Sequence, residues 1–107
     1  MEEGNMNTLH TIVDIDQFEF TGHSRSRAGQ RAITMEAVTC VVTYGCVYRA
    51  GSHDVAYWLN NRALKAAGKA GHRMRKFNGI CVVVTHTNTI KTVMHCKRAP
   101  RHWAALM

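Results

Sequence analysis

Acidic residues are scarce in the last two thirds of this sequence. The 107 residues include 14 Lys and Arg against 7 Asp and Glu, and Asp54 is the only acid after Glu36. Nucleases that hold two metal ions need a cage of carboxylates, and most glycoside hydrolases need a pair of them. The scarcity therefore argues against a two-metal nuclease and against a carboxylate-pair glycosidase.

Common catalytic motifs and long apolar runs are also missing. The sequence contains no P-loop, no G-x-G-x-x-G, no G-x-S-x-G and no H-E-x-x-H. No uninterrupted apolar run exceeds five residues, whereas a membrane span needs roughly 20. No positively charged start precedes an apolar stretch at the N-terminus, so we expect a cytoplasmic protein with no secretory signal and no membrane partner.

The cysteines form no short pairing motif. The closest two are six residues apart, whereas the ligands of a structural zinc site usually lie about two to five residues apart. We therefore expect reduced thiols, no metal and no cofactor, and a metal-binding regulator built from scattered Cys and His ranks last among the alternatives. The four cysteines are Cys40, Cys46, Cys81 and Cys96.

The charge is distributed unevenly along the chain. Residues 1–36 contain six acids and three arginines, whereas residues 37–107 contain eleven Lys and Arg and one acid. A surface so poor in carboxylates attracts polyanions, and nucleic acid is the commonest such partner. An acidic protein would be attracted by the same positive charge. The third interpretation is a basic domain that has no such partner.

Periodicity and turn signals predict one α+β domain over residues 9–107, behind a flexible leader at 1–8. Thr34 and Glu36 suit the first turn of a helix that Gly45 would end, although the valines and threonines between them favour a strand. The expected elements are a strand or arm at 9–20, helices beginning at 22 and after Thr34, strands at 46–49 and 55–59, a helix at 61–77, and a hairpin of strands at 80–85 and 89–95.

The expected helix at 61–77 carries a stripe of cations. Their steps of 3, 4, 4 and 3 would align them on one helical face. No acid interrupts the stripe, so no salt bridge explains it, and RNA-backbone binding competes with a plain solvated face. Gly68 and Gly71 each weaken the helix by about 1 kcal/mol, so it can break near them. The stripe is Arg62, Lys65, Lys69, Arg73 and Lys76.

Histidine and arginine are the residues available for chemistry. In metal-independent RNA cleavage the ribose 2′-hydroxyl is the nucleophile, so the protein needs only to move protons and stabilise phosphoryl charge. His23, Arg27 and Arg31 recur every four residues and would lie along one helical face, where a solvated face is the alternative. Thr92 and His95 in the final hairpin are candidates for supporting contacts, or plain residues of a strand surface.

Two segments resemble the bacterial domain-of-unknown-function 4258 family. They are HSRSRAGQRAITMEAV at 23–38 and ICVVV through IKTV at 80–93. The resemblance implies a RelE-like fold, with two N-terminal helices packed on a small twisted antiparallel sheet and one basic helix before the C-terminal hairpin. It also implies RNA cleavage without metal, with His23, Arg27, Arg31 and Thr92 in the site. The family has an aromatic residue after the Thr-Val of its last strand, whereas this chain has Met94 there. His95, the next residue, is the candidate to take over the role of that aromatic.

Charge, residue types and resemblance together predict a small basic endoribonuclease of toxin type. RNA is the expected substrate and an acidic antitoxin an expected partner. The alternative is a catalytically inactive binding module whose basic face docks nucleic acid or an acidic protein, as in a phage-type inhibitor or a toxin-neutralising protein.

Overall fold

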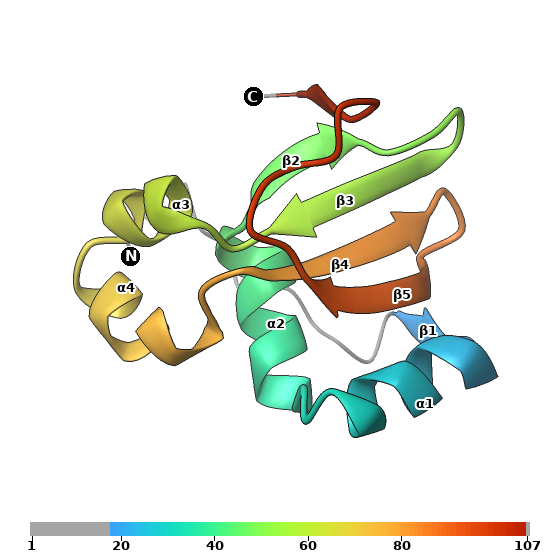
Figure 1. Cartoon of the computed structure of the whole chain (residues 1–107), viewed down its shortest axis with the longest axis horizontal. Helices are drawn as coiled ribbons and strands as arrows, with labels where there is room; N and C mark the ends of the chain where they lie inside the picture. Colours follow the sequence, from blue (N-terminus) through green and yellow to red (C-terminus); the bar gives the residue numbers. More distant parts are fainter. Residues whose placement is uncertain (1–17, 107) are drawn as a thin grey trace, which may run out of the picture.

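The computed structural model describes residues 18–106, so the predicted leader at 1–8 and most of the predicted strand or arm at 9–20 lie outside the described residues. The described chain forms a six-stranded sheet in the order β1-β5-β4-β3-β2-β6, with helices beside it (Figure 1). The α+β class is confirmed. The elements are β1 Glu19–Phe20, α1 Gly22–Gln30, α2 Met35–Tyr44, β2 Cys46–Arg49, β3 Asp54–Trp58, α3 Asn61–Ala66, α4 Lys69–Arg73, a 3-10 helix Arg75–Phe77, β4 Ile80–Thr85, β5 Thr89–His95 and β6 Ala104–Ala105.

The sheet is mixed, which corrects the expectation of a small antiparallel sheet. β1 runs parallel to β5, with Glu19 beside Thr89 and Phe20 beside Ile90, while the other neighbouring strands are antiparallel. Parallel neighbours need a long connection between them, and the whole chain from α1 to β4 separates β1 from β5. The predicted arrangement of two helices on a purely antiparallel sheet is therefore not matched.

Helix α2 forms despite its β-branched composition. Thr34 is the predicted N-cap, and its hydroxyl accepts a hydrogen bond from the Ala37 amide at 3.1 Å. Val38 and Val41 are fully buried, and burying each contributes about 1.5–3 kcal/mol, more than the propensity of valine costs in a helix. Gly45 is the C-cap of α2, as predicted. Its φ of −64° is open to any residue, so glycine is needed there for space, because a Cβ would lie 2.5 Å from the Val41 carbonyl oxygen.

Strand β4 is buried on both faces, and its side chains alternate between two clusters. Ile80, Val82 and Val84 pack with the helices, whereas Cys81 and Val83 pack on the opposite face. Figure 1 shows the segment after β5 crossing that opposite face on its way to β6, which pairs with β2. A strand covered on both sides reads as a continuous apolar run. The second cluster also contains Tyr48, Ala56, Trp58, Met94 and Trp103.

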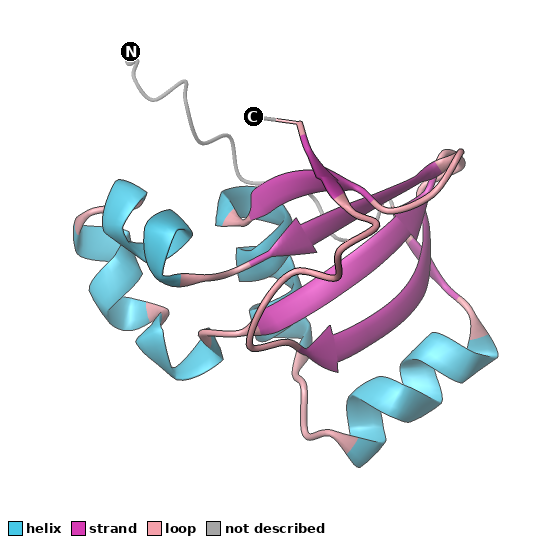
Figure 2. Cartoon of the chain, turned by 45° about the horizontal axis from the view of Figure 1, so that its top comes forward, coloured by secondary structure: helices cyan, strands magenta, loops and turns pink. Residues whose placement is uncertain are grey.

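The predicted single helix at 61–77 is wrong. The segment forms α3, α4 and the 3-10 helix Arg75–Phe77, and Figure 2 shows these short helices gathered at one end of the sheet. The break lies at Gly68, whose φ of +63° belongs to the left-handed region that glycine adopts at no steric cost. Gly71 then lets α4 approach α3, since a Cβ there would lie 2.0 Å from the Leu64 carbonyl oxygen. The cations of this segment therefore do not share one helical face.

We expect Gly71→Ala to lower the free energy of unfolding by about 1–3 kcal/mol, the usual cost of overpacking, because α3 or α4 must move to admit the new Cβ. Gly29→Ala is the matched control. A Cβ at Gly29 of α1 meets nothing within 4 Å, and alanine gains about 0.5–1 kcal/mol over glycine inside a helix. Urea unfolding measures both variants, and unchanged stability of Gly71→Ala would contradict the close α3–α4 contact.

Candidate functional site

Helix α1 carries the first predicted constellation. Ser24 and Ala28 are its buried positions. Each step of four residues rotates the position by about 40° around the helix axis. Position 31 therefore lies closer to this buried side than position 27 does. Arg27 accordingly remains exposed, whereas Arg31 is half-buried and its Nη1 donates a hydrogen bond to the Val93 carbonyl oxygen of β5. Arg31 therefore joins α1 to the last long strand of the sheet.

His23 and Thr92 complete the set that the family resemblance implies. His23 lies in α1, but its side chain is outside what the structure describes. Thr92 is half-buried and pairs with Val83 of β4, a member of the cluster opposite the helices. Cross-strand partners share a face of the sheet, so Thr92 lies on the face away from α1. The structure therefore does not bring Thr92 and Arg31 together on one face of the sheet.

His95 lies in a different place, at the mouth of a pocket of about 670 Å³ that we call the His95 pocket. Because β3 and β5 both run antiparallel to β4, their C-terminal ends meet at the start of β4, where Trp58 pairs with Cys81 and His95 with Ile80. The chain beyond each end supplies the remaining walls. The pocket is lined by Trp58, Asn60, Asn61, Arg62, Asn78, Gly79, His95, Cys96 and Lys97.

Hydrogen bonds hold most of the pocket wall in place. Asn60 caps α3, its Oδ1 accepting from the Ala63 amide at 2.8 Å. The Trp58 Nε1 donates to the Cys96 carbonyl oxygen at 3.3 Å. Asn78 donates through Nδ2 to the Asn61 Oδ1 at 3.0 Å. The Cys96 amide donates to the Gly79 carbonyl oxygen at 2.7 Å. The basic side chains of the lining, His95, Arg62 and Lys97, are all exposed.

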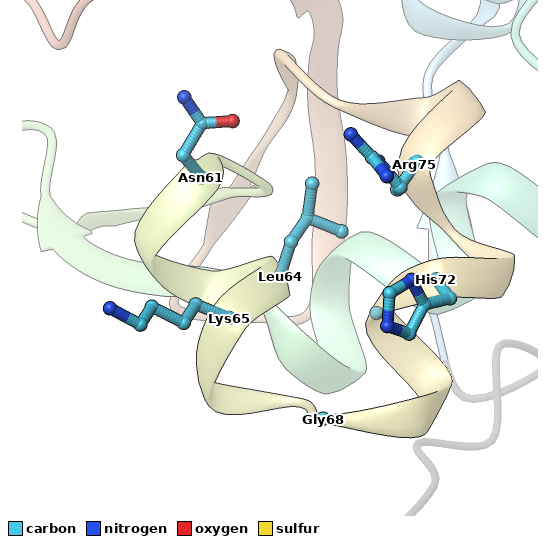
Figure 3. Close-up of a pocket in the computed structure, with 7 residues that line it drawn as sticks. Asn61, Leu64, Lys65, Gly68, His72 and Arg75 are labelled. Atoms are coloured by element: carbon cyan, nitrogen blue, oxygen red, sulfur yellow. The ribbon is translucent and has the colours of Figure 1, made fainter.

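The structure divides the five predicted RNA-binding cations among separate places. Arg62 lines the His95 pocket, and Lys65 lines a second pocket between α3 and α4 (Figure 3). Lys69 and Arg73 are exposed and line neither pocket. The Lys76 ammonium lies 5.2 Å from the centre of the Phe77 ring. The predicted alignment of these cations is wrong, because it required one continuous helix. Arg62 instead lines the same pocket as His95, one of the predicted catalytic residues.

Basic side chains line both pockets. Within residues 18–106 the one ion pair joins Lys91 to Asp54 at 2.9 Å, and Asp54 pairs with Thr85 at the opposite end of β3 from Trp58. None of the cations around the pockets therefore forms an ion pair with an acid of the described residues. Such a surface raises the local concentration of polyanions.

Sequence reasoning missed most of the pocket wall. Asn60, Asn61 and Asn78 carry the recognisable signals, an Asn-Asn pair before a helix and an Asn-Gly turn before a strand. No sequence pattern links Trp58 with Lys97, because the two residues are 39 positions apart in the chain. Only the alignment of β3 and β5 brings these residues together.

The part of the chain that the structure describes has no candidate metal site and no membrane-spanning helix. No three His, Cys, Asp or Glu side chains of residues 18–106 are grouped so that they could hold a metal ion. No helix among these residues has the length and apolar character needed to cross a bilayer.

Two thiols lie beside the His95 pocket. Cys81 is buried in β4, and Cys96 lines the pocket. Burial raises the pKa of the Cys81 thiol, and the neighbouring Cys96 raises it further. Burial also raises the pKa of Cys96, against the lowering effects of Cys81 and of the Arg31 charge. Both thiols are therefore protonated and weakly nucleophilic at neutral pH.

Comparisons with protein-family models, curated proteins and solved structures found no match to this chain. The likeness to the domain-of-unknown-function 4258 family thus stays a prediction from the sequence. The two pockets and their charge are what the structure offers to a functional proposal.

Arg31 has a structural role that Arg27 lacks, and their alanine variants should separate the two. We expect Arg31→Ala to lower the free energy of unfolding by about 1–2 kcal/mol, because the Val93 carbonyl loses a charged donor. Arg27→Ala, at an exposed position of the same helix, should change it by less than about 0.5 kcal/mol. Chemical denaturation measures both, and equal effects would contradict the bond between α1 and β5.

Cys81 should make the protein less stable at alkaline pH. Its thiol ionises near pH 9.0 in the unfolded chain, whereas its raised pKa keeps it protonated in the folded protein. The stabilisation is present below that pH and is lost as the pH rises toward the folded pKa, because unfolding then releases a proton. One proton corresponds to about 1.4 kcal/mol per pH unit. Urea midpoints from pH 8 to 10.5 should therefore fall less steeply in Cys81→Ala, and parallel curves would contradict the assignment.

Proposed function

We propose that this protein is a metal-independent endoribonuclease that binds RNA in the His95 pocket. The observation that carries the proposal is the meeting of His95, Arg62 and Lys97 around one space of about 670 Å³. Cleavage through the 2′-hydroxyl needs a proton acceptor beside the hydroxyl and cations that bind the phosphate, and an imidazole, a guanidinium and an ammonium are groups of these kinds. The Trp58 ring and the asparagine amides of the same wall can stack on a base and bond to its edge.

The reaction uses the substrate's own nucleophile. The 2′-hydroxyl gives its proton to the His95 imidazole while its oxygen attacks the adjacent phosphorus. The bond from phosphorus to the 5′-oxygen breaks, and that oxygen takes a proton from the Lys97 ammonium. The products are a 2′,3′-cyclic phosphate and a free 5′-hydroxyl. The Arg62 guanidinium stabilises the charge on the phosphoryl oxygens, and a proton passed from His95 to Lys97 through water restores both groups.

The RelE-like domain, the toxin role and an acidic antitoxin as partner belong to the same proposal. Support for the domain comes from the packing of α1 and α2 residues with a sheet whose central strands β5, β4, β3 and β2 are antiparallel. Arg27 is exposed on α1 and would bind a further phosphate, while Arg31 holds α1 against β5. An acidic antitoxin would neutralise the cations that RNA otherwise binds.

A binding module without catalysis is the second candidate function. The division of the predicted catalytic residues favours it, since Arg31 is bonded to Val93 and Thr92 lies on the opposite face of the sheet. Such a protein would use its cations to dock nucleic acid or an acidic protein, and the RNA would remain intact.

We expect the protein to cleave end-labelled RNA in excess chelator and His95→Ala to slow cleavage by about 10²–10⁴-fold, the usual contribution of a general acid or base. His102→Ala is the matched control, because His102 is exposed and lies outside the pocket. Cleavage that is lost in His23→Ala but normal in His95→Ala would move the chemistry to α1 and contradict the pocket assignment.

Filter binding in the same samples separates the two candidate functions. RNA that stays intact with the wild-type protein but is retained on the filter, and is retained less by Arg62→Ala than by Arg101→Ala, supports the binding module. Arg101 is exposed and lies outside the pocket, so its variant removes the same charge elsewhere. RNA that is neither cleaved nor retained contradicts both the endoribonuclease and a module that docks nucleic acid.

A further inference from the structure

A second pocket, which we call the α3–α4 pocket, lies beside the proposed RNA site and has a volume of about 350 Å³. Figure 3 shows the Arg75 side chain extending from its helix toward α3 and Leu64 projecting into the space between the helices, while Lys65 points outward at the rim. The lining residues are Asn61, Leu64, Lys65, Gly68, Gly71, His72 and Arg75.

The backbone fixes the shape of this pocket. Gly68 reverses the chain with a φ of +63°, and the absent side chain of Gly71 lets α4 lie against the Leu64 carbonyl. His72 and Arg75 follow directly after this contact. The groups at the mouth are therefore carried on helices whose separation is set by close backbone packing.

The polar groups around the pocket are almost all donors. Lys65, His72 and Arg75 are exposed, and their side chains make no hydrogen bond or ion pair with another residue in 18–106. The Asn61 Oδ1, an acceptor in the lining, already accepts a hydrogen bond from Asn78. A phosphate offers only acceptors and negative charge, so it matches this set, and guanidinium binds it bidentately.

Asn61 lines both pockets, so the two sites adjoin at that residue. A chain that leaves the His95 pocket past Asn61 would enter the α3–α4 pocket. RNA repeats a phosphate at every nucleotide, and an unpaired strand can place successive phosphates in neighbouring basic sites. The shared residue thus favours one polymeric ligand over two separate small molecules.

We propose that the α3–α4 pocket is a phosphate subsite for single-stranded RNA, and that it binds the phosphate next to the nucleotide in the His95 pocket through Arg75 and His72. The subsite rests on the proposed RNA-binding function. It makes single-stranded RNA with a phosphate beyond the cleaved linkage the preferred substrate class.

The test uses 2′-O-methyl dinucleotides, which lack the nucleophile and so report binding alone. One has a single bridging phosphate, and the others carry an additional phosphate at the 5′ or the 3′ end. Calorimetric titration of the full chain should show that one of the added phosphates raises the affinity about tenfold, the effect of one charge-assisted hydrogen bond. Arg75→Gln should abolish that gain.

Arg101→Gln is the matched control, because it removes the same charge from an exposed position outside both pockets, and it should retain the gain. A gain that persists in Arg75→Gln, or is absent from the wild-type protein, overturns the subsite while RNA binding itself stands. No binding of any dinucleotide by the wild-type protein overturns the RNA function together with the subsite.

Discussion

The burial of β4 on both faces is the constraint on which the rest of the structure depends. A strand that is apolar on both faces needs other elements packed against each face of the sheet. Helix α2 packs against one face, and the segment after β5, with Trp103, packs against the other. Because β4 lies between β3 and β5 and runs against both, the two neighbours end side by side. That common end is where His95, Trp58 and the start of α3 form a pocket.

The distribution of charge over the sheet follows from the same geometry. Asp54 begins β3 and forms an ion pair with Lys91 at 2.9 Å. Its carboxylate therefore lies at the opposite end of β3 from the pockets and neutralises a lysine there. The end with the two pockets has cations without acidic partners among the described residues. The shortage of acids seen in the sequence thus becomes a local positive field, and such fields steer polyanions.

Local signals predicted most of the elements. β2, β4 and β5 have the predicted bounds, β3 is shifted by one residue, and Thr34 caps α2 as expected. These features depend on neighbours within a few residues, which sequence periodicity records. The helix at 61–77 failed because Gly68 and Gly71 do more than lower helix propensity, since one reverses the chain and the other permits the close contact with Leu64.

The sequence by itself determined the α+β class, the excess of cations and the residue types available for proton transfer and phosphate binding. Only the tertiary structure decided which of these residues meet. Arg62 and His95, 33 positions apart, share a pocket, whereas Arg31 and Thr92 do not share a face of the sheet. The physical reason is that capping and periodicity act between near neighbours, while strand register and burial act between residues far apart in the chain.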